Sequence, residues 1–389
     1  MLYHLSLVAR PFLDTGTTGD AWWWLTHTPL KIFTAGTESV LVFFVLSGLV
    51  VALPALRDGF GWAGYYGTRL LRLYLPVWGA LAFAAVLIAL LPRDLAAVTA
   101  GSWTSNASVT SISLPQWLSE ASLWRPSYDI DNVLWSLRWE LVFSLTLPLF
   151  VIVARAVRDH WQLAAALAGV LTITGRLIDL DALVYLPVFF LGTLLAVRLP
   201  ELVEFCGRRG RLFWMLLAAS SLALLIASWL ARPLETSLTA NVLWGLSGIG
   251  ATGLVVVAIG SPLAKRMLSA AVPRWLGKVS FSLYLVQAPI IATLAFALGD
   301  RNWGWVAGIG IPLCLVTAWL FQLAVEKPSH RLARLAGGLA QRVSVRVRTS
   351  VASRADEQHV RSGGEAETQL VSTDRMLPAG SRNQAISGP

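Results

Sequence analysis

A histidine and a glutamate stand out because ionisable side chains are rare in the apolar segments around them. His4 can take a proton from a hydroxyl group and return it later. Glu140 follows Ser136 by four residues, so both lie on one helix face, and a carboxylate in an apolar layer needs a partner such as histidine. This favours a proton-transfer site of His4 and Glu140. A histidine without a role, an Arg138–Glu140 surface pair and the less favoured His27 are the alternatives.

Arg69 and Arg72 form a second candidate site. They are three residues apart, so on a helix they make one positive face with paired donors for phosphate groups. Positive charge at the inner surface of a membrane protein is the simpler explanation for both residues. The pair alone is therefore weak evidence for a phosphate-binding face.

Ser280, Tyr284 and Gln287 lie at helical spacing along one face of an apolar segment. Their hydroxyl and amide groups can bind a polar substrate, and hydrogen bonding between helices is the alternative use of such side chains in membranes. The sequence contains no internal repeat, nucleotide-binding loop or Cys/His metal spacing, so no metal site is predicted.

The elements that must position these residues are membrane helices. Of the 389 residues, 56% are hydrophobic and 14% are charged, whereas soluble domains are about 45–50% apolar and about 25% charged. This composition argues against a soluble enzyme and a disordered protein, and two cysteines cannot form a disulfide scaffold. The net charge of +9 is concentrated in short loops and the C-terminal region, which favours the lipid bilayer as partner and no nucleic acid.

The expected fold is all-α, a polytopic membrane bundle of about ten transmembrane helices, each of about 20 apolar residues. Residues 1–8 are too few to cross the bilayer and look like the outer end of a truncated first span. Residues 1–335 are expected to form the membrane domain and 336–389 a disordered, basic, cytoplasmic tail. The other candidate spans are 37–56, 72–92, 133–154, 161–177, 183–198, 212–230, 241–260, 279–298 and 303–325.

Alternate loops differ in their basic residues, and the richer set belongs in the cytoplasm by the positive-inside rule. This orientation puts the C-terminal tail in the cytoplasm, His4 and Glu140 toward the outer side, and Arg69 and Arg72 toward the inner side. The richer set comprises Arg57, Arg69, Arg72, Arg155, Arg158, Arg198, Arg208, Arg209, Arg211, Lys265, Arg266, Arg274 and Lys278.

Six short motifs occur in the order typical of one family. Each is short, but six in order are specific, and together they resemble the acyltransferase-3 family of bacterial integral-membrane O-acyltransferases over roughly residues 1–335. The motifs are Tyr3-His4, Phe-Phe-Val-Leu-Ser-Gly (43–48), Arg-x-x-Arg-x-Tyr-x-Pro (69–76), Leu-Trp-Ser-Leu-x-x-Glu (134–140), Gly-x-x-Ser-Phe-Ser-Leu-Tyr-Leu (277–285) and Glu-Lys-Pro (326–328).

The resemblance implies transfer of an acyl group, usually acetyl, from cytoplasmic acyl-CoA to a hydroxyl of a carbohydrate, glycolipid or other acceptor, in a bacterial plasma membrane. It implies that His4 is the catalytic base and that Glu140 is its acidic partner or an acceptor-binding group. It also implies that Arg69 and Arg72 lie near the CoA phosphates. The residues expected to bind the acceptor are Trp135, Ser136, Tyr284 and Gln287.

Three positions depart from the family pattern. Leu41 replaces an acid that is frequent before Phe-Phe. Gln287 stands where members often carry histidine, and glutamine can hydrogen-bond but cannot titrate. The arginine that members carry before their histidine would precede Met1. A catalytically degenerate family member is therefore one alternative. A transporter or flippase of a polar or lipid-linked solute is another, because it would also place polar groups among several spans.

Overall fold

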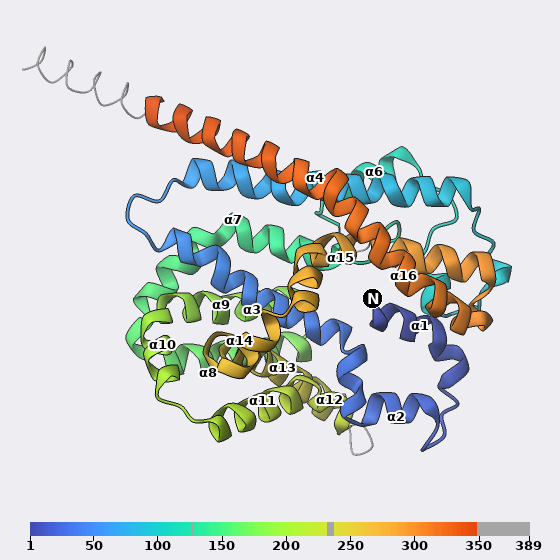
Figure 1. Cartoon of the computed structure of the whole chain (residues 1–389), viewed down its shortest axis with the longest axis horizontal. Helices are drawn as coiled ribbons and strands as arrows, with labels where there is room; N and C mark the ends of the chain where they lie inside the picture. The colour runs from blue at the N-terminus through green and yellow to red at the C-terminus, as the bar shows by residue number, and fades with distance from the viewer. Residues whose placement is uncertain (126–127, 232–236, 348–389) are drawn as a thin grey trace, which may run out of the picture.

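The computed structural model describes residues 1–125, 128–231 and 237–347, and no strand occurs in these ranges. This confirms the predicted all-α class (Figure 1). The longer helices are α3 (Gly36–Ala55), α4 (Trp62–Leu90), α7 (Leu134–Ala156), α8 (Trp161–Leu177), α9 (Asp181–Val197), α11 (Arg211–Leu225), α13 (Ser237–Gly260), α15 (Ala271–Leu298) and α16 (Trp303–Phe321). The shorter helical elements are α1 (Leu2–Leu13), α2 (Ala21–His27), η1 (Pro29–Thr34), η2 (Leu95–Ala97), α5 (Trp103–Asn106), α6 (Leu114–Ala121), η3 (Arg158–His160), α10 (Leu199–Gly207), α12 (Ala227–Leu230), α14 (Pro262–Leu268), η5 (Asp300–Asn302) and the π-helical turn η6 (Gln322–Glu326).

The protein is a multi-pass membrane protein by its helix composition. In the described ranges, six helices are long and apolar enough to cross a membrane, and α9 with α10 adds a seventh if this pair, bent by 72°, counts as one span. The sequence predicted more, about ten. The difference arises because four expected spans fall short of the roughly 20 residues that a bilayer requires. The expected first span forms α1, with 12 residues, and three others form α8, α9 and α11, with 17, 17 and 15 residues.

The C-terminal helix is longer than expected. α16, η6 and residues 327–347 belong to one apolar helical stretch of 48 residues, Asp300–Val347. In η6, the Glu326 carboxylate accepts a hydrogen bond from Ser282 of α15 at 2.5 Å, which ties this stretch to the neighbouring span.

Residues 336–347, which the sequence assigned to a polar tail, continue this helix. They cross over α4 in Figure 1, where Gly64 N–H donates to Gln341 Oε1 at 3.1 Å. A Cβ placed on Gly64 would lie 3.2 Å from the carbonyl oxygen of Gly337, so two glycines allow the close approach. The rest of the expected tail, 348–389, lies outside the described residues.

α3 and α9 cross at two glycines. A Cβ on Gly48 would lie 2.1 Å from the carbonyl oxygen of Phe189, and a Cβ on Gly192 would lie 2.0 Å from that of Val45. Both distances are impossible for a real side chain, so only glycine fits at either position. Helices in lipid gain little from the hydrophobic effect, and such close backbone packing is a main source of their association.

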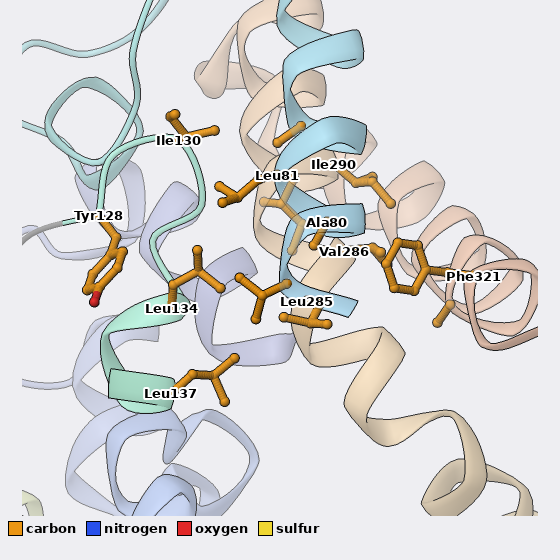
Figure 2. Close-up of a cluster of buried hydrophobic side chains, with 14 of the residues drawn as sticks. Ala80, Leu81, Tyr128, Ile130, Leu134, Leu137, Leu285, Val286, Ile290 and Phe321 are labelled. Atoms are coloured by element: carbon orange, nitrogen blue, oxygen red, sulfur yellow. The ribbon is translucent and has the colours of Figure 1, made fainter. Parts of the chain in front are cut away.

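A buried apolar cluster holds the start of α7 against α4 and α15 (Figure 2). Leu134 and Leu137 of α7, Leu81 of α4 and Leu285 of α15 are each at most 1% exposed in this cluster. The cluster fixes the N-terminal turn of α7, and therefore Ser136, beside α15. This is the part of the fold that positions the predicted site.

Replacing Gly192 with alanine should destabilise the protein by about 1–3 kcal/mol, because the new methyl group forces α3 and α9 apart. Gly304→Ala on α16 is the matched control: its Cβ would meet no atom within 4 Å, and we expect a neutral effect or a gain of about 0.5–1 kcal/mol. Thermal unfolding in detergent measures both. Equal stability of the two variants would contradict the packing argument.

Candidate active site

His4 is buried on α1 and is paired with an amide. Its Nδ1 lies 3.1 Å from Oε1 of Gln287, which is 2% exposed on α15. An amide oxygen can only accept, so this contact puts the ring proton on Nδ1 and leaves Nε2 free to take a proton. Trp103 of α5 packs beside the imidazole, with 5.0 Å between ring centroids.

A cavity of about 480 Å³ opens beside this pair. We call it the His4 cavity. It brings together residues from α1, η1, α3, α7 and α15, and it contains all four residues expected to bind the acceptor as well as His4 and Ser280. None of its described lining residues carries a charged side chain. Its polar side chains are Tyr3, His4, Thr37, Ser39, Ser136, Ser280, Tyr284 and Gln287, and its aromatic walls include Phe33, Phe43, Trp135 and Phe281.

Ser136 and Tyr284 are joined in the wall of the His4 cavity. Their hydroxyl oxygens lie 2.6 Å apart, and the Tyr284 hydroxyl also donates to the carbonyl of Val133 at 2.8 Å. Ser136 Oγ also donates to the same carbonyl at 3.3 Å, so the two hydroxyls share the carbonyl of Val133, and either can donate to the other. The predicted polar face of α15 thus meets the predicted polar start of α7.

A buried carboxylate holds the segment that leads into α7. Glu120 of α6 is 0% exposed, and it accepts hydrogen bonds from the backbone N–H groups of Asp129 and Ile130 at 3.0 and 3.1 Å. These bonds fix the chain just before Val133, which anchors Tyr284. Burial raises the pKa of Glu120 above its usual range, and its backbone hydrogen bonds act in the opposite direction.

Glu140 is placed differently from the sequence expectation. Its carboxylate forms an ion pair with Arg69 of α4 and accepts a hydrogen bond from Ser47 of α3 at 2.6 Å; it does not line the His4 cavity. Arg69 Nε also donates to Ser144 Oγ at 3.0 Å. A guanidinium is a stronger partner for a buried carboxylate than a neutral imidazole, and α4 crosses α7 at this point. The structure therefore pairs Glu140 with Arg69 and not with His4.

Arg69 and Arg72 do not act as one exposed positive face. The side chain of Arg69 is 23% exposed and turns toward α7 in the ion pair, whereas Arg72 is exposed. The difference follows from the helix, because α4 packs against α7 on the side of Arg69. We call Arg69, Glu140, Ser47 and Ser144 the polar seam.

Ser47 and Ser144 were missed by the sequence reasoning. Each is a hydroxyl residue flanked by apolar residues within its helix, and this is the signal that could have indicated them. Trp103, which packs on His4, lies in a Ser- and Thr-rich loop and carries no such signal. In the described residues no group of three His, Cys, Asp or Glu side chains is arranged to hold a metal ion.

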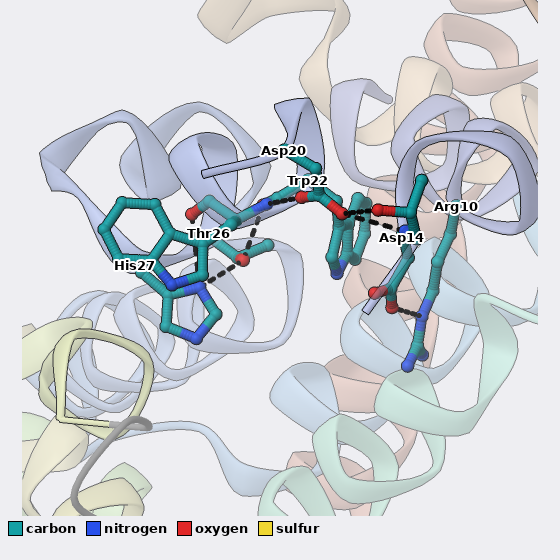
Figure 3. A network of polar contacts seen from close by, with 8 residues as sticks. Arg10, Asp14, Asp20, Trp22, Thr26 and His27 are labelled. Atoms are coloured by element: carbon teal, nitrogen blue, oxygen red, sulfur yellow. Dashed lines mark hydrogen bonds and ion pairs between the residues drawn. The ribbon is translucent and has the colours of Figure 1, made fainter. Parts of the chain in front are cut away.

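His27, the alternative histidine, lies on α2 and has local contacts (Figure 3). Its ring stacks on Trp23 with 5.4 Å between centroids, and its Nδ1 lies 2.9 Å from the hydroxyl of Thr26. It does not line the His4 cavity. These contacts lie within α2, and they indicate a local structural role for His27 away from the His4 cavity.

Removing the arginine of the polar seam should be costly. Arg69→Met leaves Glu140 buried without a cation, and we expect a loss of about 3–5 kcal/mol of stability. The double variant Arg69→Met with Glu140→Gln removes both charges and should recover a large part of this loss. Thermal unfolding of the wild type, both single variants and the double variant gives the coupling energy. If Arg69→Met is as stable as the double variant, the ion pair is excluded.

Asp131, in the segment just before α7, predicts that the stability of the protein depends on pH. Burial raises its pKa well above the usual range, and the backbone N–H of Val133 offsets only part of this. The folded carboxyl therefore keeps its proton at pH values where the unfolded one has lost it, so stability falls as pH rises above about 4. Asp131→Asn should stabilise the protein by about 1 kcal/mol or more at pH 8 and have little effect near pH 4. Thermal unfolding across this range measures it; a pH-independent difference would contradict it.

Comparison with known proteins identifies the family. Residues 1–323 match the family profile of an acyltransferase domain, and this range includes the whole His4 cavity and the polar seam. Searches of curated proteins and of solved structures returned no match. Since the matched range is most of the chain, the protein belongs to the acyltransferase-3 family of membrane proteins, whose activity is acyl transfer.

Proposed function

We propose that the protein transfers an acyl group, most simply acetyl, from cytoplasmic acyl-CoA to a hydroxyl of a carbohydrate or other envelope or secreted acceptor, with His4 as general base. The observation that carries this proposal is the His4–Gln287 pair in the wall of the His4 cavity. A histidine held in one tautomer beside a substrate-sized cavity is what proton abstraction from a hydroxyl requires.

The proposed reaction needs one base and good positioning. Nε2 of His4 takes the proton of the acceptor hydroxyl while that oxygen attacks the thioester carbonyl carbon. The carbon–sulfur bond then breaks, and the thiolate of the donor receives the proton from the imidazolium. A thioester is already activated, so holding the two reactants together supplies much of the remaining rate enhancement.

The His4 cavity favours an acceptor that is uncharged near its reacting hydroxyl. Its described lining has no charged side chain, so an anionic group brought there would lose its hydration without a cationic side chain to replace it. Trp135 and Phe43 provide apolar faces, and Ser136, Tyr284 and Gln287 provide hydroxyl and amide groups. This combination suits a neutral sugar ring or another neutral alcohol.

The basic loops support the proposed orientation in a bacterial plasma membrane. Arg57, in the loop after α3, and Arg155, in the last turn of α7, lie at one end of the bundle, where Arg155 donates to the carbonyl of Leu56, and the positive-inside rule places this end in the cytoplasm. Arg69, which the sequence placed toward the inner side, lies deeper, beside Glu140. The acyl donor then approaches from the side of the polar seam. On this proposal Glu140 and Arg69 contact the donor and do not contact His4. Arg72 adds positive charge on the cytoplasmic side.

His4→Ala should lower kcat by about 10²–10⁴-fold, the usual contribution of a general base. The measurement is release of free CoA and transfer of labelled acetyl from acetyl-CoA into envelope glycans, in vesicles that contain the full chain. His27→Ala is the matched control and should keep wild-type activity, because its contacts are local. Both variants should unfold at the wild-type temperature within about 2 °C, the shift expected for at most 0.5–1 kcal/mol.

Wild-type activity in His4→Ala would exclude His4 as the base. Labelled transfer that is absent in the folded wild type, across neutral and charged envelope fractions, would exclude the acyltransferase proposal and favour the catalytically degenerate alternative. Gln287→Leu separates a positioning role from a structural one. It should lower kcat and change the pH profile, because the imidazole loses the partner that fixes its tautomer.

A further inference from the structure

A second cavity, of about 420 Å³, lies at the other end of α3, at its loop to α4. We call it the loop cavity. Its charged and aromatic lining residues are Arg57, Asp58, Phe60, Trp62 and Arg155. No residue of the loop cavity lines the His4 cavity. Unlike the His4 cavity, it therefore carries charge, and its charge comes mainly from arginine.

The two arginines of the loop cavity come from different elements. Arg57 lies two residues after the end of α3 and is exposed. Arg155 lies in the last turn of α7 and donates to the carbonyl of Leu56 at 2.5 Å, so its guanidinium is held beside Arg57. Two guanidinium groups in one cavity present several planar donors, the arrangement that binds phosphate groups most strongly.

Aromatic rings also line the loop cavity. Phe60 and Trp62 lie 4.9 Å apart, at 87° to each other, and both are only partly buried. A nucleobase stacks on the faces of such rings without regard to its identity. Asp58 is the one acidic lining residue; it can accept hydrogen bonds from a ribose hydroxyl or a base amino group, and it repels phosphates toward the arginines.

α3 and α7 both run from the loop cavity to the His4 cavity. On α3, Ala55 lines the first and Phe43 the second; on α7, Pro148 lines the first and Leu137 the second. In both helices these positions are about 17–18 Å apart along the axis. An extended phosphopantetheine arm has a length of the same order.

The polar seam lies between the two cavities on the same helices. Ser47 falls between the two lining positions of α3, and Glu140 and Ser144 fall between those of α7. Oε2 of Glu140 is buried and has no hydrogen-bond partner among the described residues. A buried carboxylate oxygen without a donor is costly, and an amide N–H of a bound arm is a donor of the right kind.

We infer that the loop cavity binds the adenine nucleotide end of the acyl-CoA donor, with its phosphates at Arg57 and Arg155 and its base on Phe60 and Trp62. The arm then follows the polar seam toward His4. This inference rests on the proposed function, because it assigns the place of the donor in that reaction. It moves the phosphate contacts from Arg69, which is occupied by Glu140, to the loop cavity.

The test compares two donors with the full chain in vesicles. Arg57→Ala and Trp62→Leu should each raise KM for acetyl-CoA by about 10- to 100-fold, the effect of losing one charge-assisted hydrogen bond or one stacked base, with kcat nearly unchanged. Neither should change KM for S-acetylpantetheine, which lacks the nucleotide. Arg208→Ala is the control, because Arg208 is an exposed arginine paired locally with Glu204.

Equal changes for the two donors, or none with acetyl-CoA, would overturn the inference. Equilibrium dialysis of CoA with the purified chain in neutral-lipid nanodiscs gives a readout independent of transfer. Binding that depends on Arg57 and Trp62 without any acyl transfer would support the site and refute the proposed function. If neither variant changes transfer from acetyl-CoA, the proposed function is supported and the donor site is refuted. If phosphatidylglycerol stabilises the protein through the loop cavity and CoA does not bind, the loop cavity is assigned to lipid headgroups and the inference is overturned.

Discussion

A charged side chain inside the bilayer has no water to bind and must find its partner within the helix bundle. The ion pair of Arg69 and Glu140 meets this constraint with help from Ser47 and Ser144. Leaving either charge unpaired would cost several kcal/mol, so these side chains fix α3, α4 and α7 relative to one another. Because α3 and α7 line both cavities, the geometry of the whole candidate site depends on this one pair.

The same constraint operates differently at His4. A carboxylate next to a buried histidine stabilises the imidazolium and would keep the ring protonated. Gln287 instead offers a neutral acceptor at 3.1 Å, which fixes the tautomer and leaves the second nitrogen able to take a proton. The separation of Glu140 from the His4 cavity thus keeps carboxylate side chains away from the imidazole, in agreement with a lining that has no charged side chain in its described part.

Helix packing and loop contacts both position the residues of the candidate site. Close packing at Gly48 and Gly192 fixes α3, one of the two helices that line both cavities, against α9. In the loop before α7, Glu120 holds the segment before Val133 and so places Tyr284. The mobile parts of a bound donor and acceptor would then meet a preformed site, which lowers the entropic cost of bringing them together.

The sequence by itself determined the all-α membrane class, the family, and the polar face that Ser280, Tyr284 and Gln287 share on one helix. These follow from hydrophobic length, from helical periodicity and from short motifs, all of which are local along the chain. Only the tertiary structure decided that Glu140 pairs with Arg69, that three apolar segments form helices shorter than a span, and that residues 336–347 continue the last helix. The reason is physical: a buried charge takes the partner that helix crossing brings near it, and sequence spacing does not reveal which helices cross.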